Sequence, residues 1–333
     1  MANTTGFKTR INKRFSKELF LEGKHISIQD LKMREDIRQE QQVQKYLSKD
    51  ITCYPTPVEF HITEVAHATN KTSLPEIWDS EGFRGLNMNS FSWWSLKINE
   101  ADIRAAEERF LESSIPNRSK EEIAAQQPFL SKFTTSPAFN NENSRYGNFR
   151  FTFPLTELME AYKKQMCEGE EPVLRVYETK LFKQEIEYVV LVHSPQNNEK
   201  FSQYPLLTSS PLVSYDGNQV IWRAQAICET HNFQLEITGN TAVTQYMYSH
   251  QFYVWDQVSL VFHVNGVLTF PKTKLKASLS CCEHDQQVNL SHGENCSSLD
   301  EAEKFTESLP DDEFKKEDEK EEDKSGDLNM EVD

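Results

Sequence analysis

The run from Glu185 to Val192, Glu-Ile-Glu-Tyr-Val-Val-Leu-Val, constrains the fold more than any other part of the sequence. β-Branched and aromatic residues dominate it, and a proline soon ends it, which is typical of a β-strand. A preceding strand and a tight turn near Lys180 to Lys183 complete a predicted hairpin. A strand this apolar belongs in the middle of a sheet. The carboxylates of Glu185 and Glu187 are costly there unless they face a cleft or solvent.

The segments around this hairpin alternate between strand-like and helix-like patterns. Residues 58–63 and 90–98 alternate as strands do, and Asn99 is placed to cap a helix over residues 100–112. Beyond residue 197 the chain has mainly strand-like patterns, ending in an Asn-Gly turn signal near residue 265. These patterns predict an α+β fold, with one mixed, mainly antiparallel sheet and several packed helices.

Charge divides the chain into three predicted parts. Residues 1–50 carry 11 basic and 7 acidic residues and predict a basic arm (1–24) followed by an amphipathic helix at 29–47. Residues 51–285 predict the α+β domain, for which a division into two sub-lobes near residue 200 stays open. Between Glu294 and Asp333 there are 17 acidic and 5 basic residues, so residues 286–333 predict an acidic, disordered tail.

Composition also narrows the class of protein. No apolar run approaches the ~20 residues that a membrane helix needs, and the N-terminus lacks the apolar segment of a secretory signal. Six scattered cysteines indicate reduced thiols, and hence the cytoplasm or the nucleus. No basic surface with interleaved aromatic residues stands out, so protein partners are expected rather than nucleic acid or membrane. The oligomeric state stays open.

The chain contains no P-loop, GxGxxG, GxSxG, HExxH or CxxC motif, which argues against kinases, dinucleotide-fold oxidoreductases, α/β-hydrolases and metalloproteases. Cys281-Cys282-Glu-His284 matches no standard zinc spacing, so no metal site is predicted. Three pairs of polar residues remain as candidates for a site: His61 and Thr63 on an early strand, Ser144 and Tyr146 at the end of the long loop 127–148, and Glu185 and Glu187 on the hairpin.

This arrangement resembles the ADP-ribosyltransferase fold. Many members of that family place a His-x-Thr on an early strand, a serine and a tyrosine before a middle strand, and a glutamate at the start of a late strand. The resemblance implies NAD as the cofactor, and it leaves catalytic activity open. It also assigns roles to the candidates: His61, Thr63, Ser144 and Tyr146 would hold the nicotinamide–ribose end, Glu187 would orient a ribose hydroxyl and stabilise an oxocarbenium-like transition state, and Glu185 would engage the acceptor.

Such chemistry is physically reasonable for these residue types. A cationic transition state needs an anion close by in a dry cleft, and a nicotinamide ring needs an aromatic side chain to stack on. The sequence departs from the family pattern in its spacing, which is longer from His61 to Tyr146 and shorter from Tyr146 to Glu187, and in Ile62, which stands where a glycine is usual. The strand around Asp256 could also take the place of the glutamate strand.

Two further interpretations belong beside this one. The whole chain resembles a multi-copy family of fish proteins that share Phe-Ser-Trp-Trp-Ser-Leu and Phe-Tyr-Val-Trp-Asp-Gln-Val segments, a resemblance that supplies no mechanism. The alternative function is that of a non-catalytic interaction protein, whose β-rich body and acidic tail bind other proteins.

Overall fold

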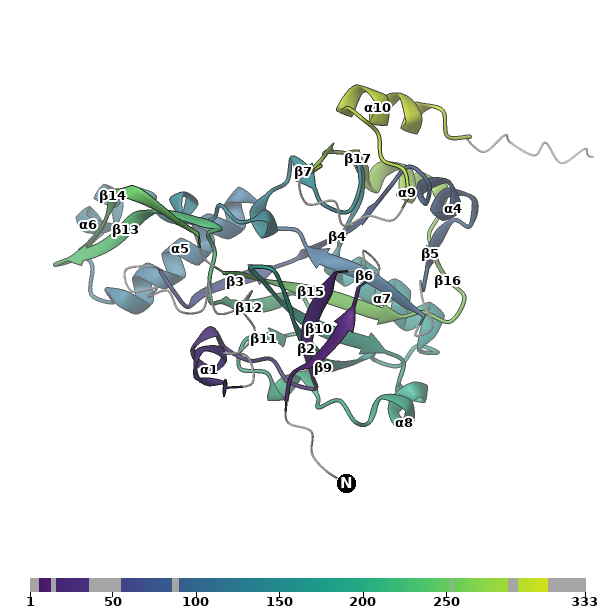
Figure 1. Cartoon of the computed structure of the whole chain (residues 1–333), viewed down its shortest axis with the longest axis horizontal. Helices are drawn as coiled ribbons and strands as arrows, with labels where there is room; N and C mark the ends of the chain where they lie inside the picture. Colours follow the sequence, from purple (N-terminus) through teal and green to yellow (C-terminus); the bar gives the residue numbers. More distant parts are fainter. Residues whose placement is uncertain are drawn as a thin grey trace, which may run out of the picture.

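The computed structural model describes residues 6–12, 16–35, 55–85, 90–252, 254–286 and 293–310. A nine-stranded sheet runs through the body in the order β1-β2-β9-β10-β15-β6-β4-β8-β17 (Figure 1). β10 and β15 are parallel, and the other neighbours in this sheet are antiparallel. Its strands are β1 (Lys8–Ile11), β2 (Lys17–Glu22), β4 (Glu64–Thr69), β6 (Phe91–Leu96), β8 (Phe149–Pro154), β9 (Val173–Phe182), β10 (Glu185–His193), β15 (Trp255–His263) and β17 (Leu279–Cys281).

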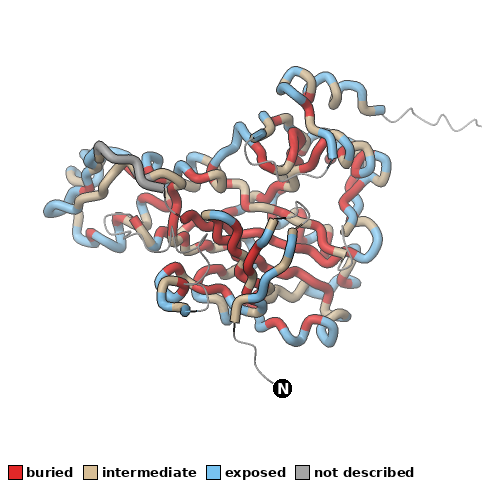
Figure 2. The backbone as a smooth tube through the Cα atoms, in the orientation of Figure 1, coloured by how far each residue is buried: buried red, intermediate tan, exposed pale blue. Residues whose placement is uncertain are grey.

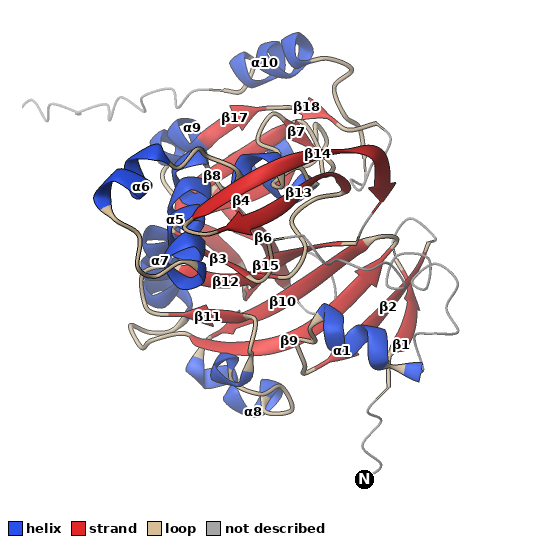
Figure 3. Cartoon of the chain, turned by 90° about the vertical axis from the view of Figure 1, so that its left-hand side faces the viewer, coloured by secondary structure: helices blue, strands red, loops and turns tan. Residues whose placement is uncertain are grey.

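Smaller sheets flank the large one. A three-stranded sheet has the order β11-β12-β3, and three strand pairs are separate from it. One of these pairs, the hairpin β13–β14, extends with α6 to one end of the molecule (Figures 1 and 3). The strands are β3 (Val58–Ile62), β5 (Gly82–Arg84), β7 (Asn143–Ser144), β11 (Val213–Tyr215), β12 (Val220–Ala224), β13 (Thr230–Thr238), β14 (Thr241–Phe252), β16 (Val267–Thr269) and β18 (Glu283–His284).

The helices follow from local sequence signals. Asn99 and Ser119 each close a capping box, at the starts of α5 and α6, as their sequences predict. The helices are α1 (Ile28–Met33), α4 (Leu74–Asp79), α5 (Glu100–Ser114), α6 (Lys120–Ala125), α7 (Leu155–Met166), α8 (Asn198–Phe201), α9 (Lys272–Ser278) and α10 (Leu299–Glu307), with 3-10 turns η1 (Leu130–Lys132), η2 (Pro137–Phe139), η3 (Pro195–Asn197) and η4 (Leu207–Ser209). The predicted α+β fold with a mainly antiparallel sheet is confirmed.

β10 lies in the interior of the nine-stranded sheet, and all nine of its residues are buried (Figure 2). One face carries Ile186 and Tyr188, which belong to the main core. The other face changes character along the strand. Val189 and Leu191 pack in a second apolar cluster with Phe201 of α8, whereas the same face at the start of β10 carries the two glutamates. The polar end of this face therefore marks the place to look for a site.

The N-terminal region differs from its prediction. Residues 1–24 are predicted to be an arm, yet β1 and β2 form the edge of the large sheet. Leu19 and Leu21 are buried, and the Arg10 guanidinium donates to both carboxylate oxygens of Glu178 in β9. The predicted helix at 29–47 corresponds to α1 at its start, and residues 36–54 lie outside the described residues.

The C-terminal region differs as well. The predicted tail begins at residue 286, but α10 lies within that range and packs on the body. The Phe305 ring lies 5.7 Å from that of Phe149, and the Lys71 ammonium lies 2.9 Å from a Glu301 carboxylate oxygen. Residues 311–333 fall outside the described part of the chain. Strands from either side of residue 200 are neighbours, since β10 pairs with β15. In the described ranges, no helix has the length and apolarity needed to cross a membrane.

Candidate functional site

The two glutamates of β10 are buried side by side on the polar face of the sheet. Glu185 is 5% exposed and Glu187 is 2% exposed. The register of the sheet supplies their partners, because Glu187 lies opposite Lys180 of β9 on one side and Gln257 of β15 on the other. Neighbouring strands thus bring a cation to Glu187 and an amide or hydroxyl donor to each carboxylate.

Glu187 is bound from two directions. It forms an ion pair with the Lys180 ammonium, and the Ser259 hydroxyl donates a short hydrogen bond to its other oxygen. Burial opposes the charged carboxylate, but the Lys180 charge and these hydrogen bonds outweigh it, so the pKa of Glu187 lies below its ordinary value. Burial likewise opposes the charged amine of Lys180, yet Glu187 raises the pKa of that amine above its ordinary value.

Glu185 is paired separately. The Arg145 guanidinium donates to both of its oxygens, at 2.8 and 3.4 Å, and the Gln257 amide also donates to it. Arg145 lies against the Trp255 ring, 4.8 Å from its centroid, and 5.5 Å from that of Tyr146. Each glutamate therefore has its own cation, which is the usual condition for burying a carboxylate.

The loop that precedes β8 places Tyr146 beside these ion pairs. The Ser144 hydroxyl accepts a hydrogen bond from the Tyr146 backbone N–H at 3.1 Å. Gly147 follows with φ +140°, and a Cβ there would lie 2.1 Å from the carbonyl oxygen of Thr69. Only glycine permits this approach of the loop to the end of β4. Burial raises the pKa of the Tyr146 hydroxyl to about 12, so it stays a neutral donor.

A cavity of about 420 Å³ opens beside Glu187, and we name it the glutamate cavity. Its volume is within the range of ligand pockets. Aromatic side chains and small polar residues of β4, β6 and β15 form its walls. The residues that line it include His67, Trp93, Trp94, Tyr146, Lys180, Glu187 and Ser259.

His67 lines this cavity, and its ring packs against those of Phe83 and Trp94, with centroids 5.0 and 5.4 Å away. Its Nδ1 lies 2.8 Å from the Trp93 carbonyl oxygen, which can only accept, so Nδ1 carries the proton. Burial lowers the pKa of the imidazole to about 4. The ring is therefore neutral near pH 7, and its Nε2 is an acceptor for a hydroxyl or amide donor.

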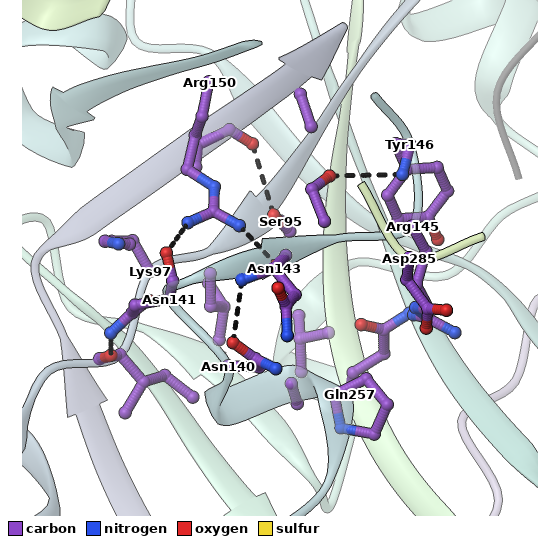
Figure 4. A pocket seen from close by; sticks show the side chains of 18 of the residues that line it. Ser95, Lys97, Asn140, Asn141, Asn143, Arg145, Tyr146, Arg150, Gln257 and Asp285 are labelled. Carbon is purple, nitrogen blue, oxygen red and sulfur yellow. Dashed lines mark hydrogen bonds between the residues drawn. The ribbon is translucent and has the colours of Figure 1, made fainter. Parts of the chain in front are cut away.

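A second cavity of about 180 Å³ adjoins the first, and we name it the Lys97 cavity (Figure 4). Polar side chains from the loop 135–146, from β6 and from β8 line most of it. The two cavities share Ala66, Ala68, Ser95, Tyr146 and Gln257 as lining residues, so Tyr146 stands between them.

The structure brings four of the six predicted site residues together. Glu187 and Tyr146 line the glutamate cavity, Ser144 lines the Lys97 cavity, and Glu185 is linked to Tyr146 through Arg145. His61 and Thr63 are elsewhere and line neither cavity. The His61 side chain pairs with Glu59 in the three-stranded sheet, at 2.7 Å, and Thr63 is exposed.

His67, and not His61, lines the glutamate cavity. His67-Ala68-Thr69 repeats the His-x-Thr pattern six residues later, and it lies in β4, next to β6. The sequence therefore offers two candidate histidines, because two His-x-Thr segments follow one another. The rival Asp256 has a structural role: its buried carboxylate accepts from the backbone N–H groups of Gln225 and Ala226 and from Trp222 Nε1, and burial raises its pKa to about 7.

Comparison with protein-family models, with curated proteins and with solved structures finds no match for this chain. Within the described residues, no group of three or more His, Cys, Asp or Glu side chains is placed to hold a metal ion. The site is thus defined by its own geometry: a charge-paired glutamate, Glu187, a neutral histidine and several aromatic rings around a cavity. Such a lining suits a flat aromatic group that carries hydroxyl donors.

Proposed function

We propose that the chain is an ADP-ribosyltransferase-like module that binds NAD or an ADP-ribosyl group in the glutamate cavity. The observation that carries the proposal is the meeting of His67, Tyr146 and Glu187 around one space. A histidine, a tyrosine and a glutamate are the residue types through which the family that the chain resembles holds NAD. Here they come from three separate parts of the sequence, which makes their meeting informative.

Each group has a plausible contact with the nucleotide. Trp93 and Tyr146 offer aromatic surfaces on which a nicotinamide ring stacks. Nε2 of His67 accepts from a ribose hydroxyl, and the Glu187 carboxylate accepts from another. The cavity therefore supplies stacking for the base and acceptors for the sugar.

The charge state of Glu187 favours binding over cleavage. Its oxygens already take the Ser259 hydroxyl and the Lys180 ammonium. Breaking the nicotinamide–ribose bond develops positive charge on the sugar, and an anion stabilises that charge only where no cation compensates it. With Lys180 in place we expect NAD binding without measurable turnover.

Calorimetric titration of NAD into the full chain tests the proposal. We expect wild type to bind, and His67→Gln to bind at least about tenfold more weakly, because one buried hydrogen bond is worth roughly 1.4 kcal/mol. His61→Gln is the matched control, since His61 also belongs to a His-x-Thr segment but lies outside the cavity. Its affinity should equal that of wild type. Absence of binding at millimolar NAD, or equal losses in both variants, would contradict the proposal.

A second function, protein interaction, is supported by the hairpin β13–β14. Ile237, Val243 and Tyr246 are 47%, 48% and 56% exposed on this projecting element. By the register of the hairpin, Ile237 and Tyr246 lie on one face and Val243 on the other, so both faces expose large apolar side chains of the kind found at contact surfaces. The double substitution Ile237→Asp and Val243→Asp should leave the affinity for NAD unchanged in the calorimetric titration. That result would show that the hairpin surface and the NAD site are independent of each other.

A further inference from the structure

Lys97 is one of the residues that line the Lys97 cavity. It follows β6 on the same face as Trp93 and Ser95, and its backbone N–H donates to the Glu64 carbonyl oxygen at 2.9 Å. Its side chain is half-buried. The amine makes no hydrogen bond or ion pair with any residue that the structure describes.

Arg150 of β8 is a second cation without a carboxylate partner in the described chain. It is 8% exposed, and its guanidinium donates to the backbone oxygens of Asn141 and Asn143, at 2.6 and 3.0 Å. These carbonyls hold the guanidinium in place but do not neutralise it. Figure 4 shows Lys97 and Arg150 on one side of the cavity.

The acidic residues of the cavity lie apart from this pair. In Figure 4, Asp285 lies beside Arg145, on the side opposite Lys97 and Arg150. Glu229 accepts a hydrogen bond from the Gln184 amide at 2.7 Å. Neither acid forms an ion pair with Lys97 or Arg150 in the described residues, and the Glu64 charge acts on Lys97 less strongly than the Arg150 charge does, so one half of the cavity carries net positive charge.

The Asn140 amide adds a further donor to the lining of the cavity. Asn140 accepts the backbone N–H groups of Glu142 and Asn143 with its Oδ1, both at 2.9 Å, which leaves its Nδ2 as a donor. An ammonium, a guanidinium and an amide together match the acceptor-only oxygens of a phosphate group. A carboxamide acceptor or an apolar group would leave both cations unpaired.

We propose that Lys97, Arg150 and Asn140 form a binding site for a phosphate-class anion in the Lys97 cavity. The anion could be free phosphate or pyrophosphate, or the diphosphate of a nucleotide whose other end occupies the adjoining glutamate cavity. The identity of the molecule that brings the phosphate rests on the proposed function, whereas the anion site itself does not.

The pKa of the Lys97 amine can be used to detect anion binding at this site. Burial and the nearby Arg150 charge lower the pKa of the amine to about 8, with a smaller opposing effect of Glu64. An anion bound at the amine favours its charged form and raises that pKa. Ligand binding should therefore slow the reaction of Lys97 with an acylating reagent, because only the neutral amine reacts.

The test is competitive acylation of the full chain between pH 6.5 and 10, with peptide mass spectrometry to follow each lysine. We expect pyrophosphate to raise the apparent pKa of Lys97 by at least about one unit, which slows its labelling at pH 8 roughly fivefold. Chloride at matched ionic strength should not do so. The exposed Lys164 is the internal control and should keep its rate. An unchanged rate for Lys97 in pyrophosphate would overturn the proposal.

Two further arms sharpen the test. Lys97→Met should abolish calorimetric binding of pyrophosphate, and Lys97→Arg should restore it, because the charge and donors return. NAD and nicotinamide are then compared as protecting ligands. Protection by NAD but not by nicotinamide would assign the phosphate to a nucleotide. Protection by pyrophosphate alone would assign it to a free anion and would count against NAD binding in the adjoining glutamate cavity.

Discussion

Glu187 and Lys180 form a buried charge pair at the site, with side chains 2% and 17% exposed. Removing a charge from water costs several kcal/mol, and the partner offsets this only while both charges are present. The pair is also placed by the register of β9 and β10 rather than by a flexible loop. We therefore expect its two members to be strongly coupled in stability.

A double-mutant cycle measures this coupling. Lys180→Met should lower the free energy of unfolding by about 3–5 kcal/mol, because it leaves the Glu187 carboxylate buried without a cation. Adding Glu187→Gln should recover at least about 1 kcal/mol of that loss. Urea denaturation of the four proteins gives the result. Strictly additive losses would show that the two side chains do not act as a pair.

Of the residues predicted from the sequence, Glu187 lines the glutamate cavity and His61 does not. Two carboxylates at the start of an apolar strand signal a local conflict, which the structure resolves with ion pairs and a cavity. His61 and His67 carry the same His-x-Thr pattern. The choice between them depends on which strand joins the large sheet, and that pairing is set by contacts with distant residues.

The loop 127–148 is the element on which the position of Tyr146 depends. It ends at Gly147, which combines φ +140° with a close approach to Thr69. A side chain at this position meets both backbone strain and a steric clash. The sequence predicted a long loop here, but the contact with the end of β4 could not be derived from it.

Gly147→Ala tests the importance of that contact. We expect it to lower the free energy of unfolding by about 2 kcal/mol or more and to weaken NAD binding, because Tyr146 is displaced. Gly217→Ala is the matched control: it also has positive φ, at +103°, but nothing lies within 4 Å of the added Cβ. It should cost about 1 kcal/mol and leave NAD binding intact. Equal effects on binding would argue against a role for the loop in the site.

Other elements were not predicted because they depend on contacts between residues that are far apart in the sequence. β1 and β2 are short, and their place at the sheet edge depends on Arg10 reaching Glu178, far along the chain. α10 has few apolar residues, and its packing depends on the contact of Phe305 with Phe149. Strands and caps with strong local signals, such as β10 and the start of α5, were predicted because local residues alone specify them.

Buried neutral histidines make the stability of the whole fold depend on pH. Burial lowers the pKa of His25, His67 and His263 to about 4 each. Between an ordinary pKa of 6.5 and about 4, the unfolded chain binds protons that the folded chain excludes. The folded state therefore loses stability as pH falls through this window. Asp256 acts in the opposite direction, since its pKa is raised to about 7.

His25 isolates one of these contributions. It is 2% exposed, and its Nε2 donates to the Val189 carbonyl oxygen at 3.0 Å. The stability difference between wild type and His25→Gln should shrink by up to about 3 kcal/mol between pH 7 and pH 4. Urea denaturation across that range measures it. A difference that stays constant with pH would show that His25 is not held neutral in the fold.

Diffraction from crystals of the full chain soaked in NAD tests the central claim most directly. We predict difference density for the nicotinamide–ribose end in the glutamate cavity, with the ring against Trp93 or Tyr146 and a ribose hydroxyl near His67 Nε2. The Lys180–Glu187 pair should remain intact beside an uncleaved ligand. Density for NAD at another place on the molecule, or an empty glutamate cavity at a saturating NAD concentration, would contradict the account.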